Sequence, residues 1–325
     1  MTSGPGFSDL RAAQERIRPY VHRTPVLTST SIDAMVGASL FFKCENFQKV
    51  GAFKYRGATN AVQLLSEDQA ARGVVTHSSG NHAAALALAA KMRNIAAYIV
   101  MPRTAPRIKQ AAVEGYGGRI TFCEPNVKSR EETAAQLVER TGATLIHPFD
   151  DENVIAGQGT AALELLEDVP DLDAMLAPVG GGGLLSGTAI ACRGIRPGIR
   201  VIGCEPAVAA DAAESLRVGS IVPARPPASI CDGLLTSLGK HTFPILRAMV
   251  DEILLAEESE IVRATMTIMQ RMKIVVEPSA AVTLAVVLSR RGEFAGRRVG
   301  LILSGGNVDL ARLASAIEAT TGAKG

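Results

Sequence analysis

Short apolar segments rich in β-branched residues alternate with longer, alanine-rich segments along nearly the whole chain. The first kind is typical of strands buried in a parallel sheet, and the second of helices that pack on such a sheet. Strands are expected at 40–43, 73–76, 96–101, 119–122, 144–147, 174–179, 200–205 and 299–304. Helices are expected between them, for example at 81–92, 130–140, 157–167 and 279–289. The pattern predicts an α/β protein with mostly parallel open sheets flanked by helices.

The number of predicted strands indicates two sheets and therefore two lobes. Residues 66–148 have the pattern of four β/α units, and we expect them to form a small domain inserted into a larger one. The large domain then consists of residues 1–65 and 149–325. The cleft between two such domains is the expected binding site.

Composition narrows the class of partner. The chain has 325 residues, of which 47% are hydrophobic, and its net charge is only +2 because 34 Lys and Arg face 32 Asp and Glu. The basic residues are scattered, so neither nucleic acid nor membrane is expected, and a small molecule is. The five cysteines form no C-x-x-C pair and indicate reduced thiols in a cytoplasmic protein.

Four consecutive glycines, Gly180–Gly183, follow the predicted strand 174–179 and precede an apolar helical segment. Residues without Cβ let backbone N–H groups approach a ligand, and the helix start adds further unpaired N–H groups. Together they predict a phosphate-binding turn. No Gly-Lys-Ser/Thr follows, and Gly181, Gly183 and Ser186 give only an incomplete dinucleotide fingerprint. A phosphorylated cofactor other than a nucleotide fits better, although a glycine turn used only for packing stays an alternative.

Lys54 lies between Phe53 and Tyr55, after a glycine turn and at the start of a predicted helix. Most helical lysines are solvated surface residues. The functional alternative is an amine that Phe53 partly desolvates, so that its pKa falls and it becomes nucleophilic. Such an amine can form a Schiff base with an aldehyde cofactor.

Residues 43–58, KCENFQKVGAFKYRGA, closely resemble the Schiff-base lysine segment of fold type II pyridoxal-phosphate enzymes. The resemblance extends from HRTPVL at 22–27 to SGGNVDL at 304–310. Within that family the chain is most similar to serine racemases and short catabolic serine/threonine dehydratases. The resemblance implies a two-lobed fold like that of the tryptophan synthase β subunit, with pyridoxal 5′-phosphate as cofactor and a homodimer as assembly.

The resemblance also implies roles for individual residues. Lys54 would bind the cofactor covalently and act as base, and Phe53 would pack against the pyridine ring. Asn81 would meet the phenolic oxygen, Gly180, Gly181, Gly182 and Gly183 the phosphate, and Ser304 the pyridine nitrogen.

A second implied set of residues binds substrate and metal. Ser78, Ser79, Asn81 and His82 open a helix whose N–H groups would bind the substrate carboxylate. We also expect a serine to cap this helix start, which does not exclude binding. Further implied residues are His77 and Arg130 for a second substrate carboxylate, and Glu205, the Ala209 carbonyl and Asp211 for Mg²⁺ or Ca²⁺.

A hydroxyl such as that of Ser304 cannot keep a pyridine nitrogen protonated as a carboxylate does, so the ring is a weaker electron sink. Prompt loss of a β-substituent is then favoured. We expect a lyase that eliminates water from a hydroxyamino acid, giving a 2-keto acid and ammonia. L-serine and L-threonine rank first as substrates, and L-threo-3-hydroxyaspartate follows closely. Ser79, on the face opposite Lys54 in similar racemases, keeps a serine or aspartate racemase as the alternative. A non-catalytic amino-acid-binding protein is a remote third, against which the intact Lys54 argues.

Overall fold

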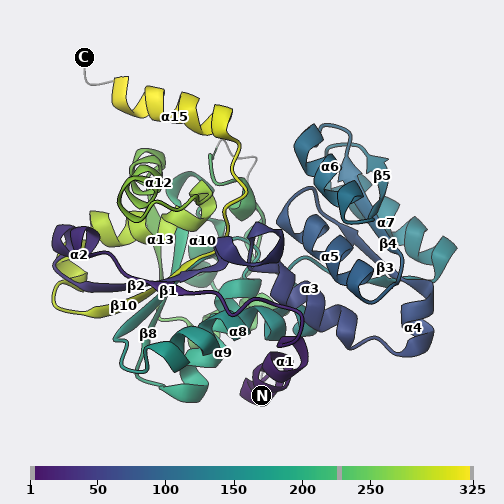
Figure 1. Ribbon diagram of the computed structural model, residues 1–325, viewed down its shortest axis with the longest axis horizontal. Helices are drawn as coiled ribbons and strands as arrows, with labels where there is room; N and C mark the ends of the chain where they lie inside the picture. The colour runs from purple at the N-terminus through teal and green to yellow at the C-terminus, as the bar shows by residue number, and fades with distance from the viewer. Residues whose placement is uncertain (1–3, 225–228, 323–325) are drawn as a thin grey trace.

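The computed structural model describes residues 4–224 and 229–322, and the two predicted sheets form two lobes (Figure 1). The large lobe is built on a six-stranded sheet of order β1-β2-β10-β7-β8-β9, and the small lobe on a four-stranded sheet of order β5-β4-β3-β6. All neighbouring strands are parallel except β1 and β2. The α/β class with mostly parallel sheets is therefore confirmed.

The strands of the large lobe are β1 (Val26–Leu27), β2 (Ser39–Cys44), β7 (Ala174–Pro178), β8 (Arg200–Pro206), β9 (Glu252–Ala256) and β10 (Arg298–Leu303). Those of the small lobe are β3 (Val74–His77), β4 (Ala97–Pro102), β5 (Arg119–Cys123) and β6 (Thr144–Leu145). All eight predicted strands are present, but β6 is shorter than predicted. The prediction missed β1 and β9, which lie at the two edges of the large sheet and carry only short apolar patterns.

The α-helices are α1 (Phe7–Ile17), α2 (Thr30–Val36), α3 (Lys54–Gln63), α4 (Glu67–Arg72), α5 (Asn81–Met92), α6 (Arg107–Gly115), α7 (Val127–Thr141), α8 (Glu152–Asp168), α9 (Gly183–Ile195), α10 (Asp211–Val218), α11 (Thr242–Met249), α12 (Glu258–Met272), α13 (Pro278–Ser289), α14 (Arg291–Phe294) and α15 (Leu310–Gly322). Short 3₁₀ helices lie at Glu45–Phe47, Lys49–Gly51, Ala207–Ala209 and Asp232–Leu234. Each of the four helices used as examples above is present.

Alanine-rich helices pack closely because small side chains let helices approach the sheets and one another. Helix α13 is buried along most of its length, and α8 packs against both α3 and α9. Ala58 and Val62 of α3 belong to the same apolar cluster as Val74 of β3 and Leu86 of α5. Helix α3 therefore joins the small lobe to the large one. The division of the chain into domains at 65/66 and 148/149 remains a prediction.

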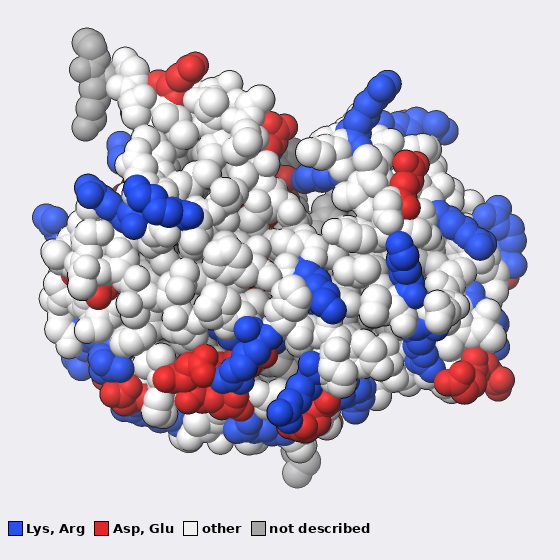
Figure 2. All heavy atoms as spheres, viewed as in Figure 1, with Lys and Arg blue, Asp and Glu red and all other residues white. Residues whose placement is uncertain are grey.

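The visible face is hollowed between the lobes, and side chains of both charges lie side by side along its lower edge (Figure 2). Among the helices of residues 4–224 and 229–322, none combines the length and apolar character that crossing a membrane requires.

Candidate active site

A cavity of about 690 Å³ lies between the lobes. Every residue that the sequence assigned to cofactor or substrate contributes to its walls. From the large lobe come the 53–54 segment, the four glycines and Ser304, and from the small lobe come 77–82 and Arg130. Segments far apart in the sequence thus meet at the carboxyl ends of parallel strands, where open α/β sheets bind their ligands.

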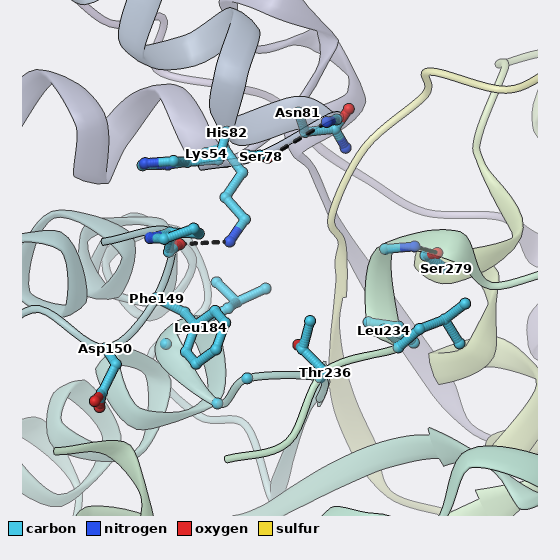
Figure 3. A pocket seen from close by; sticks show the side chains of 18 of the residues that line it. Lys54, Ser78, Asn81, His82, Phe149, Asp150, Leu184, Leu234, Thr236 and Ser279 are labelled. Carbon is cyan, nitrogen blue, oxygen red and sulfur yellow. Dashed lines mark hydrogen bonds between the residues drawn. The ribbon is translucent and has the colours of Figure 1, made fainter. Parts of the chain in front are cut away.

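Lys54 is the first residue of α3, and its side chain points into this cavity, toward Phe149 and Leu184 (Figure 3). Its Nζ donates a hydrogen bond of 2.7 Å to the Pro148 carbonyl and lies 5.2 Å from the centroid of the Phe53 ring. Desolvation by the cavity walls lowers the pKa of Lys54 to about 8, although the nearby Glu277 carboxylate opposes this shift. The lysine is therefore no solvated surface residue, and a neutral amine is accessible near neutral pH.

The glycine turn Gly180–Gly183 leads from β7 into α9, and Gly182 has a left-handed φ of 89°. A Cβ at Gly180, Gly181 or Gly182 would collide with Leu234, Phe149 or Thr242, and a Cβ at Gly183 would lie a tight 3.0 Å from the Phe149 carbonyl oxygen. The close packing thus favours glycine throughout the turn, and backbone N–H groups and the uncapped start of α9 line the cavity. Such a turn suits an anion.

Residues 78–82 form the turn before α5 and its first residues. The residue that precedes the helix is Gly80, and no side chain caps it. The expected serine cap is therefore wrong, and the start of α5 keeps its N–H groups for a ligand. The His82 ring is buried against the Ile146 carbonyl, with its Nε2 3.4 Å from that oxygen. It therefore offers a substrate its backbone more readily than its imidazole.

Ser304 follows β10, and its backbone is joined to the lysine segment because Phe53 N–H donates to the Ser304 carbonyl at 3.0 Å. Ser304 lines the cavity although it is only 3% exposed. Glu277, which the sequence did not single out, also lines the cavity, and Asn81 Nδ2 donates to both of its carboxylate oxygens.

Basic side chains form the wall on the small-lobe side. His77 and His147 stand edge to face with ring centroids 5.3 Å apart, and burial lowers the pKa of both, that of His147 to about 4. Asp150 N–H donates to His147 Nδ1 at 2.9 Å, so the proton of this neutral ring is on Nε2. Across the described residues, the Arg130 side chain makes no ion pair or hydrogen bond, and its Nε is buried without a partner. Arg130 thus has no carboxylate partner among the described residues.

The predicted metal residues lie apart from this cavity, from the end of β8 to the first residue of α10. The Glu205 carboxylate accepts hydrogen bonds from the N–H groups of Ala212 and Ala213 at 2.8 and 3.0 Å. Burial raises the pKa of Glu205 to about 8 and that of Asp211 to about 6, and Asp211 Oδ2 is buried without a partner. Among described residues no cluster of three His, Cys, Asp or Glu side chains suits a metal, so Glu205 and Asp211 would not hold an ion by side chains of these types alone.

Comparisons with known proteins identify the chemistry of the cavity. A family model described as pyridoxal-phosphate dependent enzyme matches residues 17–305. The chain belongs to this family of pyridoxal-phosphate-dependent enzymes. It is 51% identical over 306 residues to serine racemase of Oryza sativa subsp. indica, covering 93% of this chain and 90% of that one.

Two further relatives of this pyridoxal-phosphate enzyme match it over nearly their whole length. β-Hydroxyaspartate dehydratase of Paracoccus denitrificans is 51% identical over 309 residues, covering 95% of this chain and 98% of that one. The crystal structure of serine racemase from Dictyostelium discoideum matches with a TM-score of 0.91 and 48% identity, covering 94% of this chain and 99% of that one. The predicted family, cofactor and enzymatic nature are confirmed, and the remote alternative of a non-catalytic binding protein loses its support.

The residues present fit pyridoxal phosphate. The cavity offers an amine whose pKa is near 8 for the aldehyde, a glycine turn at a helix start for the phosphate, and a hydroxyl for the pyridine nitrogen. Sequence reasoning missed Glu277, His147 and Lys109, which also line the cavity. The only sequence signal for Glu277 was a carboxylate directly before Pro278, which is common at helix starts.

Proposed function

We propose that this enzyme removes water from L-hydroxyamino acids and so yields a 2-keto acid and ammonia. The observation that carries the proposal is the desolvated Lys54 amine, which faces the same cavity as the glycine turn and the Ser304 hydroxyl. The names of the relatives, which include a hydroxyaspartate dehydratase, support the same class of reaction.

In the proposed site Lys54 holds the cofactor, Phe53 packs on its ring, Asn81 meets its phenolic oxygen, Gly180–Gly183 bind its phosphate and Ser304 meets its pyridine nitrogen. Bound pyridoxal phosphate makes the α carbon of a joined amino acid acidic, because it accepts the electrons of the C–H bond.

Three protein groups then perform the reaction. The N–H groups at the start of α5, beside Ser78 and Ser79, bind the α-carboxylate. Lys54 takes the α proton, since its lowered pKa leaves a neutral amine to act as base. The Ser304 hydroxyl limits charge build-up at the α carbon, so the β-hydroxyl leaves promptly. In the overall balance the proton that Lys54 removes departs with this hydroxyl as water, and one water then hydrolyses the dehydrated product to the 2-keto acid and ammonia.

The unpaired Arg130 favours a substrate with a second carboxylate. An arginine binds a carboxylate through two parallel N–H donors, and the neighbouring His77 lies on the same wall. We therefore place L-threo-3-hydroxyaspartate ahead of L-serine and L-threonine, which the sequence alone had ranked first.

Arg130→Met is expected to lower kcat/KM for L-threo-3-hydroxyaspartate by about 100-fold, because the β-carboxylate loses its charged partner. The value for L-serine should change by less than about threefold, since serine has no β-carboxylate. Keto-acid assays on both substrates measure this, with Arg103→Met, an exposed arginine of the small lobe, as control. An equal loss for both substrates would contradict the assignment.

Racemisation is the second candidate, favoured by the serine racemase relatives and by the place of Ser79 in the cavity wall. Chiral analysis of the serine that remains after incubation with L-serine separates the two reactions. We expect keto acid to exceed D-serine, and Ser79→Ala to abolish whatever D-serine forms. Keto acid from none of the three substrates would sink the elimination proposal.

We further propose that Glu205, the Ala209 carbonyl and Asp211 hold Mg²⁺ or Ca²⁺. Support comes from two buried carboxylates with raised pKa values and from the partnerless Asp211 Oδ2, since hard cations prefer oxygen ligands. After chelation, added Mg²⁺ or Ca²⁺ is expected to raise the unfolding temperature. In the Asp211→Asn variant, the same rise in unfolding temperature should require at least about a tenfold higher metal concentration. Asp171→Asn, an exposed aspartate paired with Arg298, should leave the effect unchanged.

Finally, we propose a cytoplasmic homodimer with a small domain of residues 66–148 and a large domain of 1–65 and 149–325. All five cysteines are free and buried, which suits a reducing compartment. Phe47 and Val275 are exposed apolar residues on neighbouring segments, because Asn46 Nδ2 donates to the Val275 carbonyl at 3.1 Å. Light scattering tests the dimer.

A further inference from the structure

Glu277 is a carboxylate in an unexpected place. It precedes α13, is only 4% exposed, and lines the active-site cavity. It is paired with no Lys or Arg within the described residues. Burial, together with the nearby Asp232 carboxylate, raises the pKa of Glu277 to about 7. The charge of Lys109 opposes this shift but makes no ion pair with Glu277. Burying a carboxylate without a direct ion pair costs stability, and groups kept at such a cost are often functional.

Helix capping does not explain Glu277. Although the residue occupies the position before α13, its side chain makes no capping hydrogen bond to that helix. Its oxygens instead turn toward the small lobe, where Asn81 Nδ2 donates to Oε1 at 3.0 Å and to Oε2 at 3.2 Å. The contact therefore runs from one lobe to the other.

The other end of the Asn81 amide is held as well. Asn307 Nδ2 donates to Asn81 Oδ1 at 2.9 Å and to the Val50 carbonyl at 2.7 Å. With its oxygen facing a donor and its nitrogen facing a carboxylate, the Asn81 amide has only one favourable orientation. A flipped amide would put its oxygen against the Glu277 carboxylate and its NH₂ against that of Asn307.

The surrounding backbone is shaped around this arrangement. A Cβ on Gly305 would lie 2.5 Å from Glu277 Oε1, and a Cβ on Gly51 would lie 2.8 Å from Asn307 Oδ1. Glycines at both positions therefore make room for the two side chains that hold Asn81. The packing indicates a fixed network rather than a chance contact.

We propose that Glu277 is a positioning residue that acts through Asn81. It accepts one N–H of the Asn81 amide and so directs the remaining N–H into the cavity, where, on the function proposed above, it meets the phenolic oxygen of the cofactor. Glu277 and Asn307 belong to the large lobe and Asn81 to the small lobe, so these contacts also join the two lobes.

The experiment compares Glu277→Ala, Glu277→Gln, Asn81→Ala and the double variant Glu277→Ala/Asn81→Ala, each as holoenzyme. The readouts are the absorption spectrum of the bound cofactor, its dissociation constant, and kcat and KM with L-threo-3-hydroxyaspartate. Glu258→Gln is the matched control, because Glu258 is a half-buried carboxylate of the large lobe that binds Ser229 and Ile230 outside the cavity.

We expect Glu277→Ala to shift the absorption maximum in the same direction as Asn81→Ala and to lower kcat by about 10- to 100-fold. The double variant should be no worse than Asn81→Ala, because residues that act as one unit are not additive. Glu277→Gln should recover most of the loss, since its amide oxygen can still accept from Asn81. Glu258→Gln should resemble the parent enzyme.

Three results would overturn the inference. They are multiplying effects of the two single variants, an unchanged spectrum in Glu277→Ala, and a Glu277→Gln variant as impaired as Glu277→Ala. The spectrum requires no turnover, so it separates this inference from the proposed reaction. A shifted spectrum in an enzyme that makes no keto acid would support the role of Glu277 and contradict the elimination.

Discussion

Lys54→Ala is expected to lower keto-acid formation by about 10⁴-fold and to abolish covalent retention of pyridoxal phosphate. The variant removes both the amine that joins the cofactor and the base that takes the α proton. The loss should therefore appear in kcat and in the absorption of gel-filtered protein. Steady-state assays and spectra recorded after removal of free cofactor measure the two effects separately.

Lys91→Ala is the control for this experiment, because Lys91 is an exposed helical lysine in the last turn of α5. It should retain both activity and bound cofactor. Retained activity in Lys54→Ala, or loss of cofactor from Lys91→Ala, would contradict the assignment of the amine.

The lowered pKa of Lys54 adds a dependence on pH. With a pKa of about 8, roughly a tenth of the amine is neutral at pH 7, against less than about one in a thousand for an ordinary lysine. The rate at which cofactor-free enzyme captures pyridoxal phosphate should rise with pH and level off above about 8. Stopped-flow absorbance measures this rate. A capture rate still rising steeply near pH 10 would indicate an unperturbed lysine.

The features predictable from the sequence were those written in local runs of residues. The four glycines at Gly180–Gly183 and the lysine segment around Lys54 each signal a turn, a helix start or a reactive amine within a few positions. Alternation of apolar strands and alanine-rich helices likewise fixes the class of fold, because each element must bury one face.

The features that stayed hidden depend on contacts between distant residues. Glu277 lies 196 positions from Asn81, and nothing near Glu277 in the sequence distinguishes it from a solvated helix-start carboxylate. The unpaired state of Arg130 is equally invisible, because pairing depends on what every other element brings nearby. The edge strand β9 was missed because five residues, three of them half-buried, give too short a pattern.

Four buried charges beneath the lysine segment were also unpredictable from sequence. Arg56, two residues after Lys54, is fully buried and donates to Glu45 on one side and to Glu164 of α8 on the other. Lys43 of β2 donates to Glu164 Oε2 at 2.6 Å. The two cations and two anions balance, and together they tie the start of α3 to β2 and α8.

Arg56→Met is expected to lower the free energy of unfolding by about 3–5 kcal/mol. The methionine fills most of the space, but Glu45 and one oxygen of Glu164 lose their charged donors and stay buried. Activity should fall as well, because the first turn of α3 carries Lys54 and loses its anchor. Urea unfolding followed by circular dichroism, at fixed cofactor concentration, measures the change in stability.

Arg23→Met provides the matched control. Arg23 also bridges two carboxylates, Glu167 and Asp168, but its side chain is 50% exposed. Water and salt already compensate an exposed pair, so its removal should cost no more than about 1 kcal/mol. The difference between the two arginines therefore measures burial rather than the number of ion pairs. Equal losses for Arg56→Met and Arg23→Met would mean that water reaches the four buried charges, and that they do not anchor the catalytic lysine.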